Sequence, residues 1–288
     1  MVGIILPPFD YTNQLVKKEN VGKYKGVFMK VRVISDIHED INERYPLNYN
    51  DDTFTIIAGD ISGDPINGVV WVKNNIKNGL LVHGNHDFVY NSLSLTFQEQ
   101  QSAYINSFPL DGNVSYLNNQ YKIIDDIVFI GCCLYTDYKY NGTVNGNMRS
   151  ALKGLNDFRW GQIEEDGKFI KLEPRHYLSM FKESFDFIKK TLNKFKDKKC
   201  VLITHYGVSP LQLDPKYFTS NLNASFISNL EDFILKHNNL ALVINGHLHN
   251  SSDFKIGNTR VICNPYGYRS SVYGECNLNF NPNLIIDI

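Results

Sequence analysis

Five short apolar segments, each followed at once by a cluster of polar residues, most constrain how this chain folds. The segments are rich in β-branched residues and cover positions 31–35, 53–58, 80–83, 201–204 and 240–244. Near-continuous apolar runs of this length are typical of β-strands that are covered on both faces. Open α/β sheets place their functional sites at the carboxyl ends of such strands. The pattern therefore predicts an α/β fold with a site where these strands end.

Amphipathic patterns predict helices between the strands. Residues 176–196 carry an apolar stripe with Lys and Glu between its members, which are Leu178, Phe181, Phe185, Ile188, Leu192 and Phe195. A spacing of three to four residues places such a stripe on one face of a helix. A second stripe covers residues 224–236, and residues 92–106 form a third helical candidate.

The remaining segments complete the predicted domain organisation. Residues 254–265 and 284–288 are predicted to form strands, with a hairpin turn at Gly257-Asn258. Residues 135–175 are rich in Gly, Asn and Tyr with weak periodicity, which predicts a loop-rich insertion. We interpret residues 1–28 as an N-terminal arm, or as an extension upstream of a start at Met29. The absence of internal repeats favours one domain over residues 29–288.

Composition limits the classes of function. The net charge of −1 provides no global basic field, so binding to nucleic acid is unsupported by charge, although a local groove is not excluded. The five cysteines have no C-x-x-C spacing, which favours a reducing compartment. No run of about 18 apolar residues indicates a membrane span. We expect a soluble, cytoplasmic protein of bacterial or phage origin, and the sequence specifies no oligomeric state.

The polar clusters at the predicted strand ends supply seven potential metal ligands, which are Asp36, His38, Asp60, Asn85, His205, His247 and His249. Carboxylates combined with imidazoles suit Zn, Mn, Fe or Ni, whereas Mg and Ca sites are built from oxygen ligands. Seven ligands exceed the needs of one ion, and two ions that share a bridging carboxylate would use them all. Two ions about 3.5–4 Å apart can clamp a phosphoryl group and activate a bridging water.

The order of the motifs resembles the signature of the calcineurin-like metallophosphoesterase superfamily. The resemblance spans about residues 30–250 and rests on Asp36-Ile37-His38, Gly59-Asp60, Gly84-Asn85-His86-Asp87, His205 and Gly246-His247-Leu248-His249. Further motifs are similar to a bacterial and phage branch, namely Thr136-Asp137-Tyr138, Leu155-Asn156-Asp157-Phe158, Thr204-His205-Tyr206 and Asn264-Pro265-Tyr266-Gly267-Tyr268. The resemblance implies a four-layer αββα sandwich, in which two mixed β-sheets are flanked by helices.

The resemblance also implies a role for each motif residue. The first metal ion would be held by Asp36, His38 and His249, and the second by Asn85, His205 and His247. Asp60 would bridge the two ions, which would share a hydroxide that attacks phosphorus. His86 would be the general acid that protonates the leaving alcohol, oriented by Asp87. Members of the family often carry a second histidine after the residue equivalent to His205, and this chain has Tyr206 there. The departure puts a substrate contact in doubt, not the metal ligand.

The substrate is less constrained by the sequence. Arg149, Arg159 and the pair Asn156-Asp157 lie in the predicted insertion, where an arginine fork suits phosphate oxygens. The alternative for each arginine is a solvated loop position. We expect a phosphate mono- or diester as substrate, with a nucleotide or another small phosphoester favoured. The alternatives are a nuclease or nucleic-acid-end phosphatase of the same fold, or a non-catalytic binding module, although such modules usually carry broken ligand motifs.

Overall fold

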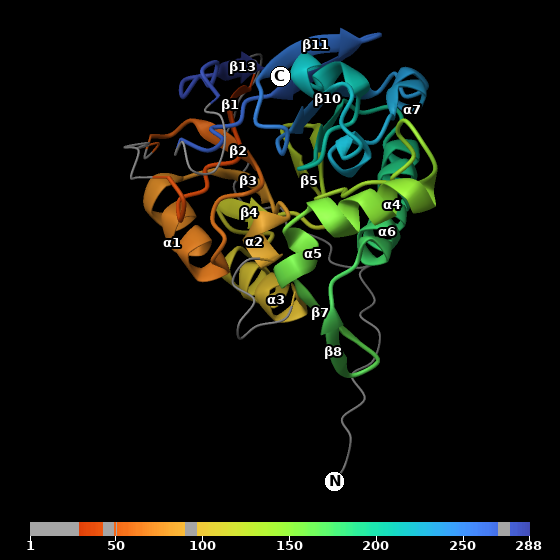
Figure 1. The fold of residues 1–288 in the computed structure, drawn as a ribbon. Coiled ribbons are helices and arrows are strands. Elements are labelled where there is room, and N and C mark those ends of the chain that lie inside the picture. The colour runs from red at the N-terminus through yellow and green to blue at the C-terminus, as the bar shows by residue number, and fades with distance from the viewer. Residues whose placement is uncertain (1–28, 43–48, 50, 90–96, 270–276) are drawn as a thin grey trace.

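A computed structural model describes residues 29–42, 49, 51–89, 97–269 and 277–288 of the chain (Figure 1). The predicted arm at residues 1–28 lies outside this described part. Two large mixed sheets account for most strands, and β7 (Gln162–Glu165) pairs with β8 (Lys168–Lys171) in a separate hairpin. The four cysteines among the described residues are buried and free, as the spacing predicts, and they are Cys132, Cys133, Cys200 and Cys263.

The first sheet has the strand order β13-β1-β2-β3-β4. Its parallel strands are β1 (Lys30–Ile34), β2 (Phe54–Ala58), β3 (Gly79–Val82) and β4 (Val114–Tyr116). The edge strand β13 (Ile285–Asp287) runs antiparallel to β1. Parallel pairing aligns the carboxyl ends of β1, β2 and β3, so the loops that follow these three strands meet at one edge.

The second sheet has the order β11-β12-β10-β9-β6-β5. Its central strands run parallel and are β6 (Ile127–Gly131), β9 (Cys200–Ile203), β10 (Leu240–Asn245) and β12 (Thr259–Cys263). The antiparallel edges are β5 (Gln120–Ile124) and β11 (Ser252–Ile256). Ile256 pairs with Thr259 around Gly257, whose φ of +57° suits glycine, and this confirms the predicted hairpin.

The two sheets pack face to face, with helices on both outer faces. One buried cluster lies between the sheets and contains, among others, Val33, Ile56 and Leu80 from the first sheet with Phe129, Ile203 and Ile244 from the second. A further cluster joins the outer face of the first sheet to α1 (Pro65–Asn75) and α3 (Phe97–Ser107), and another joins the second sheet to α6 (Pro174–Lys194) and α7 (Glu231–Leu235). This arrangement confirms the implied four-layer sandwich (Figure 1).

Local sequence signals account for the two long outer helices. Asp64 caps α1 by accepting hydrogen bonds from the backbone N–H groups of Ile66 and Asn67, and Pro65 occupies the first helical position. α6 confirms the helix predicted at 176–196, and it buries Phe181, Ile188 and Leu192 of the predicted stripe. Burial of the stripe fixes α6 against the second sheet.

Two segments differ from their predicted structure. The stripe at 224–236 forms only the 3₁₀ turn η3 (Asn223–Ser225) and the short helix α7, because residues 227–230 instead pair with the loop after β9. There Ser228 N–H donates to Gly207 O and Leu230 N–H to Val208 O. The segment 135–175, predicted as a loop-rich insertion, contains α4 (Val144–Gly154), α5 (Asp157–Trp160) and the β7–β8 hairpin. Its glycines and asparagines hide the periodicity of α4, which Thr143 caps.

Three short elements complete the described structure near the strand ends. They are the 3₁₀ turns η1 (Pro210–Gln212) and η2 (Pro215–Tyr217), and the single-turn helix α2 (His86–Val89). α2 begins four residues after β3 ends, so residues 83–85 form a tight connection between strand and helix.

Candidate metal centre

All seven predicted ligands converge where the strands of both sheets end. Asp36, Asp60 and Asn85 follow β1, β2 and β3 of the first sheet, whereas His205 and His247 follow β9 and β10 of the second. The side chain of His249 is 20% exposed, and the other six ligands are buried. The site is therefore built from both halves of the sandwich and opens to solvent beside His249.

One group of ligand atoms comes from Asp36, His38 and His249, whose donor atoms lie within 4.8 Å of one another. His38 Nε2 lies 3.0 Å from His249 Nε2. His249 Nε2 lies 3.3 Å from Asp36 Oδ1. Two imidazole nitrogens and a carboxylate oxygen at these separations could hold a transition-metal ion.

A second group comes from Asp60, His205 and His247, again within 4.8 Å. His205 Nε2 lies 3.3 Å from Asp60 Oδ2 and 3.2 Å from Asn85 Oδ1. The Asn85 amide thus adds a neutral oxygen to this group.

Asp60 lies between the two groups. Its Oδ2 is 3.3 Å from His205 Nε2 in one group and 3.8 Å from His38 Nε2 in the other. Its second oxygen, Oδ1, accepts a hydrogen bond from the backbone N–H of His86. One carboxylate therefore faces both groups with the same oxygen.

Several buried polar atoms here have no hydrogen-bond partner among the described residues. Such atoms test whether a metal ion fits the site, because an ion could take the place of the missing partner. Asp60 Oδ2 and His247 Nε2 are both of this kind. An unpaired buried polar atom is costly, and an unpaired buried charge more so. A divalent cation would give both atoms a partner, so the residues present fit a metal site.

Hydrogen bonds to His205 and Asn85 from the side away from the site determine which of their atoms faces the site. His205 Nδ1 lies 2.7 Å from Ala58 O, and donation to this carbonyl leaves Nε2 as a lone-pair donor. Asn85 Nδ2 donates to Asp157 Oδ2 at 3.0 Å, which turns Asn85 Oδ1 toward His205. Asp157 is itself buried and accepts a hydrogen bond from the hydroxyl of Tyr177. Asp157 therefore supports a ligand from behind.

Backbone strain is concentrated at this centre. Five of the seven ligands have left-handed φ values, which are 54° at Asp36, 46° at His38, 55° at Asp60, 71° at His247 and 53° at His249. For residues other than glycine this conformation costs roughly 1–3 kcal/mol each and persists where the surrounding fold enforces it. The fold thus holds the ligands in place at a cost in stability.

The electrostatics of the cluster favour the protonation states that metals need. Burial and the neighbouring His86 hold the pKa of His38 well below its ordinary value, and burial and His205 do the same for His247. Burial opposes ionisation of Asp60, but the surrounding imidazoles outweigh it and keep the carboxyl pKa well below normal. Neutral imidazoles and an ionised carboxylate are the metal-binding forms.

His205 is the exception to this pattern. Burial lowers its pKa, but the negative charge of Asp60 outweighs burial and raises the pKa to about 9. A proton on His205 and a metal ion therefore compete for the same nitrogen.

Asp87 forms hydrogen bonds with two of the loops that carry the ligands, those after β2 and β3. Its carboxylate accepts hydrogen bonds from the backbone N–H groups of Asp60, Ile61, Ser62 and Gly84 and from the hydroxyl of Tyr104. Burial and the neighbouring Asp60 raise its pKa to about 7 against these donors. Both oxygens thus face the loops after β2 and β3, and the orientation of the His86 ring by Asp87 stays a prediction.

His86 lies at the rim of the cluster and is half-buried. Its ring centre is 4.8 Å from that of His38, in an edge-to-face arrangement. The hydroxyl of Tyr268 lies 3.2 Å from His86 Nε2. Sequence reasoning did not select Tyr268, although it lies in the motif Asn264-Pro265-Tyr266-Gly267-Tyr268 that carried part of the resemblance.

Comparison with known proteins decides the family. The model of the calcineurin-like phosphoesterase family matches residues 29–251, which is more than half of the chain. The chain belongs to the calcineurin-like phosphoesterase family. It is a metal-dependent phosphoesterase that hydrolyses phosphoesters, and the Asp and His groups described above are its candidate metal ligands.

Individual proteins are similar to this chain in sequence or in fold. An uncharacterized protein of Acanthamoeba polyphaga mimivirus is 27% identical over 229 residues, which cover 72% of each chain. A phosphopantetheinyl hydrolase from Mycobacterium tuberculosis has a similar structure, with a TM-score of 0.64 and 16% identity over 85% of this chain and 91% of that one. A dimetal phosphatase from Danio rerio has a TM-score of 0.50 and 14% identity over 82% and 87% of the two chains. At these identities the two structures show that the fold is shared.

The residues predicted to contact substrate differ in their burial in the phosphoesterase. Arg149 on α4 and Arg159 on α5 are exposed, as is Asn156, which precedes α5. Tyr206 is fully buried, and its ring stacks on His247 with the ring centres 4.1 Å apart. Tyr206 therefore packs against a ligand from behind and is not placed at the cleft.

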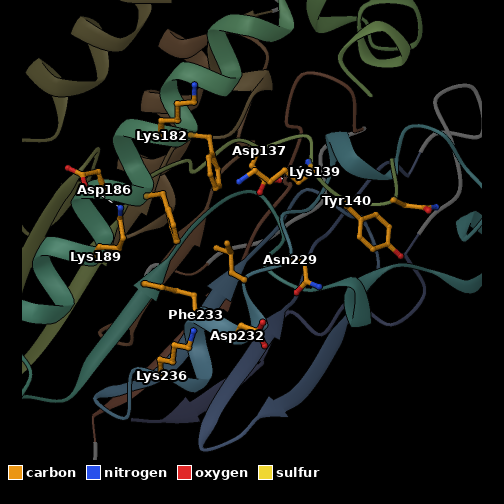
Figure 2. A pocket seen from close by; sticks show the side chains of 14 residues that line it. Asp137, Lys139, Tyr140, Lys182, Asp186, Lys189, Asn229, Asp232, Phe233 and Lys236 are labelled. Carbon is orange, nitrogen blue, oxygen red and sulfur yellow. Dashed lines mark hydrogen bonds and ion pairs between the residues drawn. The ribbon is translucent and has the colours of Figure 1, made fainter. Parts of the chain in front are cut away.

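A separate cavity of about 800 Å³ lies between α6, α7 and the loop at residues 137–141 (Figure 2). Lys182 and Lys189 of α6, and Lys236 directly after α7, are among the residues that line it. None of the seven metal-ligand candidates lines this cavity, so it is distinct from the metal centre of the phosphoesterase. Among the described residues, no helix of the phosphoesterase combines the length and apolar character needed to cross a bilayer.

Proposed function

We propose that this phosphoesterase binds a pair of divalent cations, drawn from Mn, Fe, Zn and Ni, and hydrolyses phosphate mono- or diesters with them. In this proposal Asp36, His38 and His249 hold the first cation. Asn85, His205 and His247 hold the second, and Asp60 is shared. Two of the three groups of donor atoms, Asp36-His38-His249 and Asp60-His205-His247, support this division, and the third group joins His38, Asp60 and His86.

The observation that carries the proposal is the position of Asp60 Oδ2. This oxygen is buried, has no hydrogen-bond partner among the described residues, and faces an imidazole nitrogen of each group at 3.3 Å and 3.8 Å. A carboxylate oxygen that serves only the fold would be expected to pair with a donor. A place between two cations explains why this one does not.

The cations and the protein side chains would contribute differently to phosphoester hydrolysis. When bound, a pair of divalent cations supplies water of lowered pKa and neutralises charge on a phosphoryl group. The chain holds the donor atoms in place through Ala58 and Asp157, and burial keeps the imidazoles of His38 and His247 neutral. We assign His86 the role of proton donor to the leaving oxygen, because its ring lies at the rim of the ligand cluster.

We infer that the substrate is a small phosphoester such as a nucleotide. The net charge of −1 gives the chain no general attraction for a long polyanion. A panel of nucleotides, sugar phosphates and oligonucleotides with added Mn²⁺, Ni²⁺ or Zn²⁺ tests this inference. Preference for an oligonucleotide over every small ester would replace it with a nuclease.

The experiment that tests the proposed function measures metal content and turnover together. Purified protein should hydrolyse p-nitrophenyl phosphate or bis(p-nitrophenyl) phosphate with added Mn²⁺ and stop when a chelator is added. Asp60→Asn should lower the metal content of both sites, since the shared ligand loses its charge. Asp253→Asn is the matched control, because Asp253 is a surface residue paired with Arg260. Two tightly held ions in Asp60→Asn would contradict the bridging role.

A further inference from the structure

Tyr268 occupies a place in the metal centre that no metal-binding motif predicts. Its hydroxyl lies 3.2 Å from His86 Nε2. Its ring centre lies 4.6 Å from that of His38 and 4.5 Å, edge to face, from that of His249. One tyrosine thus contacts the proposed proton donor and two proposed metal ligands.

The chain holds Tyr268 in this place through backbone pairing with the loop after β1. Tyr266 N–H donates to Ser35 O, and Gly267 N–H donates to Asp36 O, each at 2.9 Å. Asn42 completes the connection, since its amide donates to Gly267 O and its side-chain oxygen accepts from Arg269 N–H. The segment that carries Tyr268 is therefore joined to the loop that carries Asp36 and His38.

A proton donor of this kind needs a partner that fixes its ring. The resemblance assigned that task to Asp87, whose two oxygens accept hydrogen bonds from backbone N–H groups of the loops after β2 and β3. The Tyr268 hydroxyl is also placed to do it, because it can accept from or donate to His86 Nε2.

We propose that Tyr268 is the positioning residue that holds the His86 ring in the orientation from which it protonates the leaving group. This inference rests on the proposed function, in which His86 is the proton donor. It assigns Tyr268 an effect on the release of the leaving group, with no effect on metal binding.

The leaving group provides the test, since a nitrophenolate departs without a proton and an alkoxide does not. Tyr268→Phe keeps the ring and removes the hydroxyl. With an alkyl phosphate, kcat should fall about tenfold, which corresponds to the loss of one hydrogen bond. With p-nitrophenyl phosphate, kcat should be nearly unchanged, and KM and metal content should be unchanged for both esters. Tyr217→Phe is the matched control, because Tyr217 is a 52% exposed tyrosine away from these residues.

The variants of His86 separate this inference from the proposed function. His86→Ala should show the same dependence on the leaving group, with a larger loss of roughly 10²–10⁴-fold for the alkyl ester. If Tyr268 acts through His86, the double variant should be no slower than His86→Ala. Equal losses for both esters in Tyr268→Phe, or a further loss in the double variant, would overturn the role of Tyr268 alone. A His86→Ala variant that treats both esters alike would overturn the proton donor and the positioning residue together.

Discussion

Asp157 shows how a single residue outside the metal-binding motifs can set the chemistry of a ligand. An asparagine side chain presents either an oxygen or an amino group, and only the oxygen binds a cation. The hydrogen bond from Asn85 Nδ2 to Asp157 Oδ2 decides this orientation, and the Tyr177 hydroxyl holds Asp157 in turn. The sequence suggested a substrate contact for Asp157, and the structure instead places it behind Asn85.

We therefore predict that Asp157→Ala lowers metal affinity while leaving the motif ligands intact. Loss of a partner that orients a metal ligand typically costs 10–100-fold in affinity or activity, and roughly that loss is expected here. Asp157→Asn should restore most of the affinity, because an amide oxygen can still accept from Asn85. Metal titration of the apoprotein measures both variants, with exposed Asp186→Asn as control. Full affinity in Asp157→Ala would remove Asp157 from the support of the site.

At the residue scale, the sequence predicts the metal ligands better than the residues that orient them or orient His86. Each predicted ligand directly follows an apolar strand, which is a local signal. Asn85 and Asp157 are 72 residues apart, and His86 and Tyr268 are 182 apart. These pairs form only through the packing of distant segments, so no local pattern reveals them.

The turn between β3 and α2 is the element on which the ligands are most closely packed. A Cβ added at Gly84 would lie 2.0 Å from Asp60 Oδ1 and 2.7 Å from His205 Cε1. No side chain fits there unless a ligand from each sheet moves. Gly84 is thus required because a side chain has no room there. Its φ does not require glycine, since it lies outside the left-handed region.

Gly84→Ala should accordingly disrupt both the shared ligand and the second group. We expect loss of most bound metal and turnover, together with a fall in stability on the order of a few kcal/mol, as for other overpacked sites. Metal analysis and urea unfolding would show this. Gly167→Asn is the control, because Gly167 has nothing within 4 Å of an added Cβ, and asparagine tolerates its φ of +73°. Normal metal content in Gly84→Ala would show that the ligands can shift without cost.

Elements also mark where local patterns stop predicting structure. The strands β1, β2, β3, β9 and β10, the helix α6 and the β11–β12 hairpin follow from periodicity and turn residues alone, whereas β4 to β8 were not predicted. Residues 227–230 have helical periodicity, yet they pair with the loop after β9 because that loop offers backbone groups for hydrogen bonds. Tertiary pairing outweighs local propensity there. In α4, glycine and asparagine weaken the signal, although the helix forms.

At the scale of the whole molecule, the metal centre takes its ligands from both sheets. Asp36, Asp60 and Asn85 belong to the first sheet, and His205 and His247 belong to the second. A cation that binds both sets would link the sheets at the edge where their strands end. Local patterns predicted most strands of each sheet, although not β4, β5 or β6, and the stacking of the sheets followed only from the resemblance.

Metal removal should therefore lower the thermal stability of the whole chain. Ligands that bind only the folded state stabilise it by mass action, by about 2.7 kcal/mol at a concentration one hundred times Kd. Calorimetry should show a Tm that rises with Mn²⁺ concentration in the wild type and falls with chelator. Asp60→Asn should show a much smaller rise. A wild-type Tm that does not change with Mn²⁺ concentration would mean that no cation joins the two sheets.

The division of the ligands between the two sheets also sets an order of events during biosynthesis. A ribosome makes Asp36, His38, Asp60 and Asn85 first, then His205, and it makes His247 and His249 only after β10. A growing chain that stops before β10 lacks a ligand for each of the proposed cations. Complete loading with metal is therefore a late step that must wait for the second sheet.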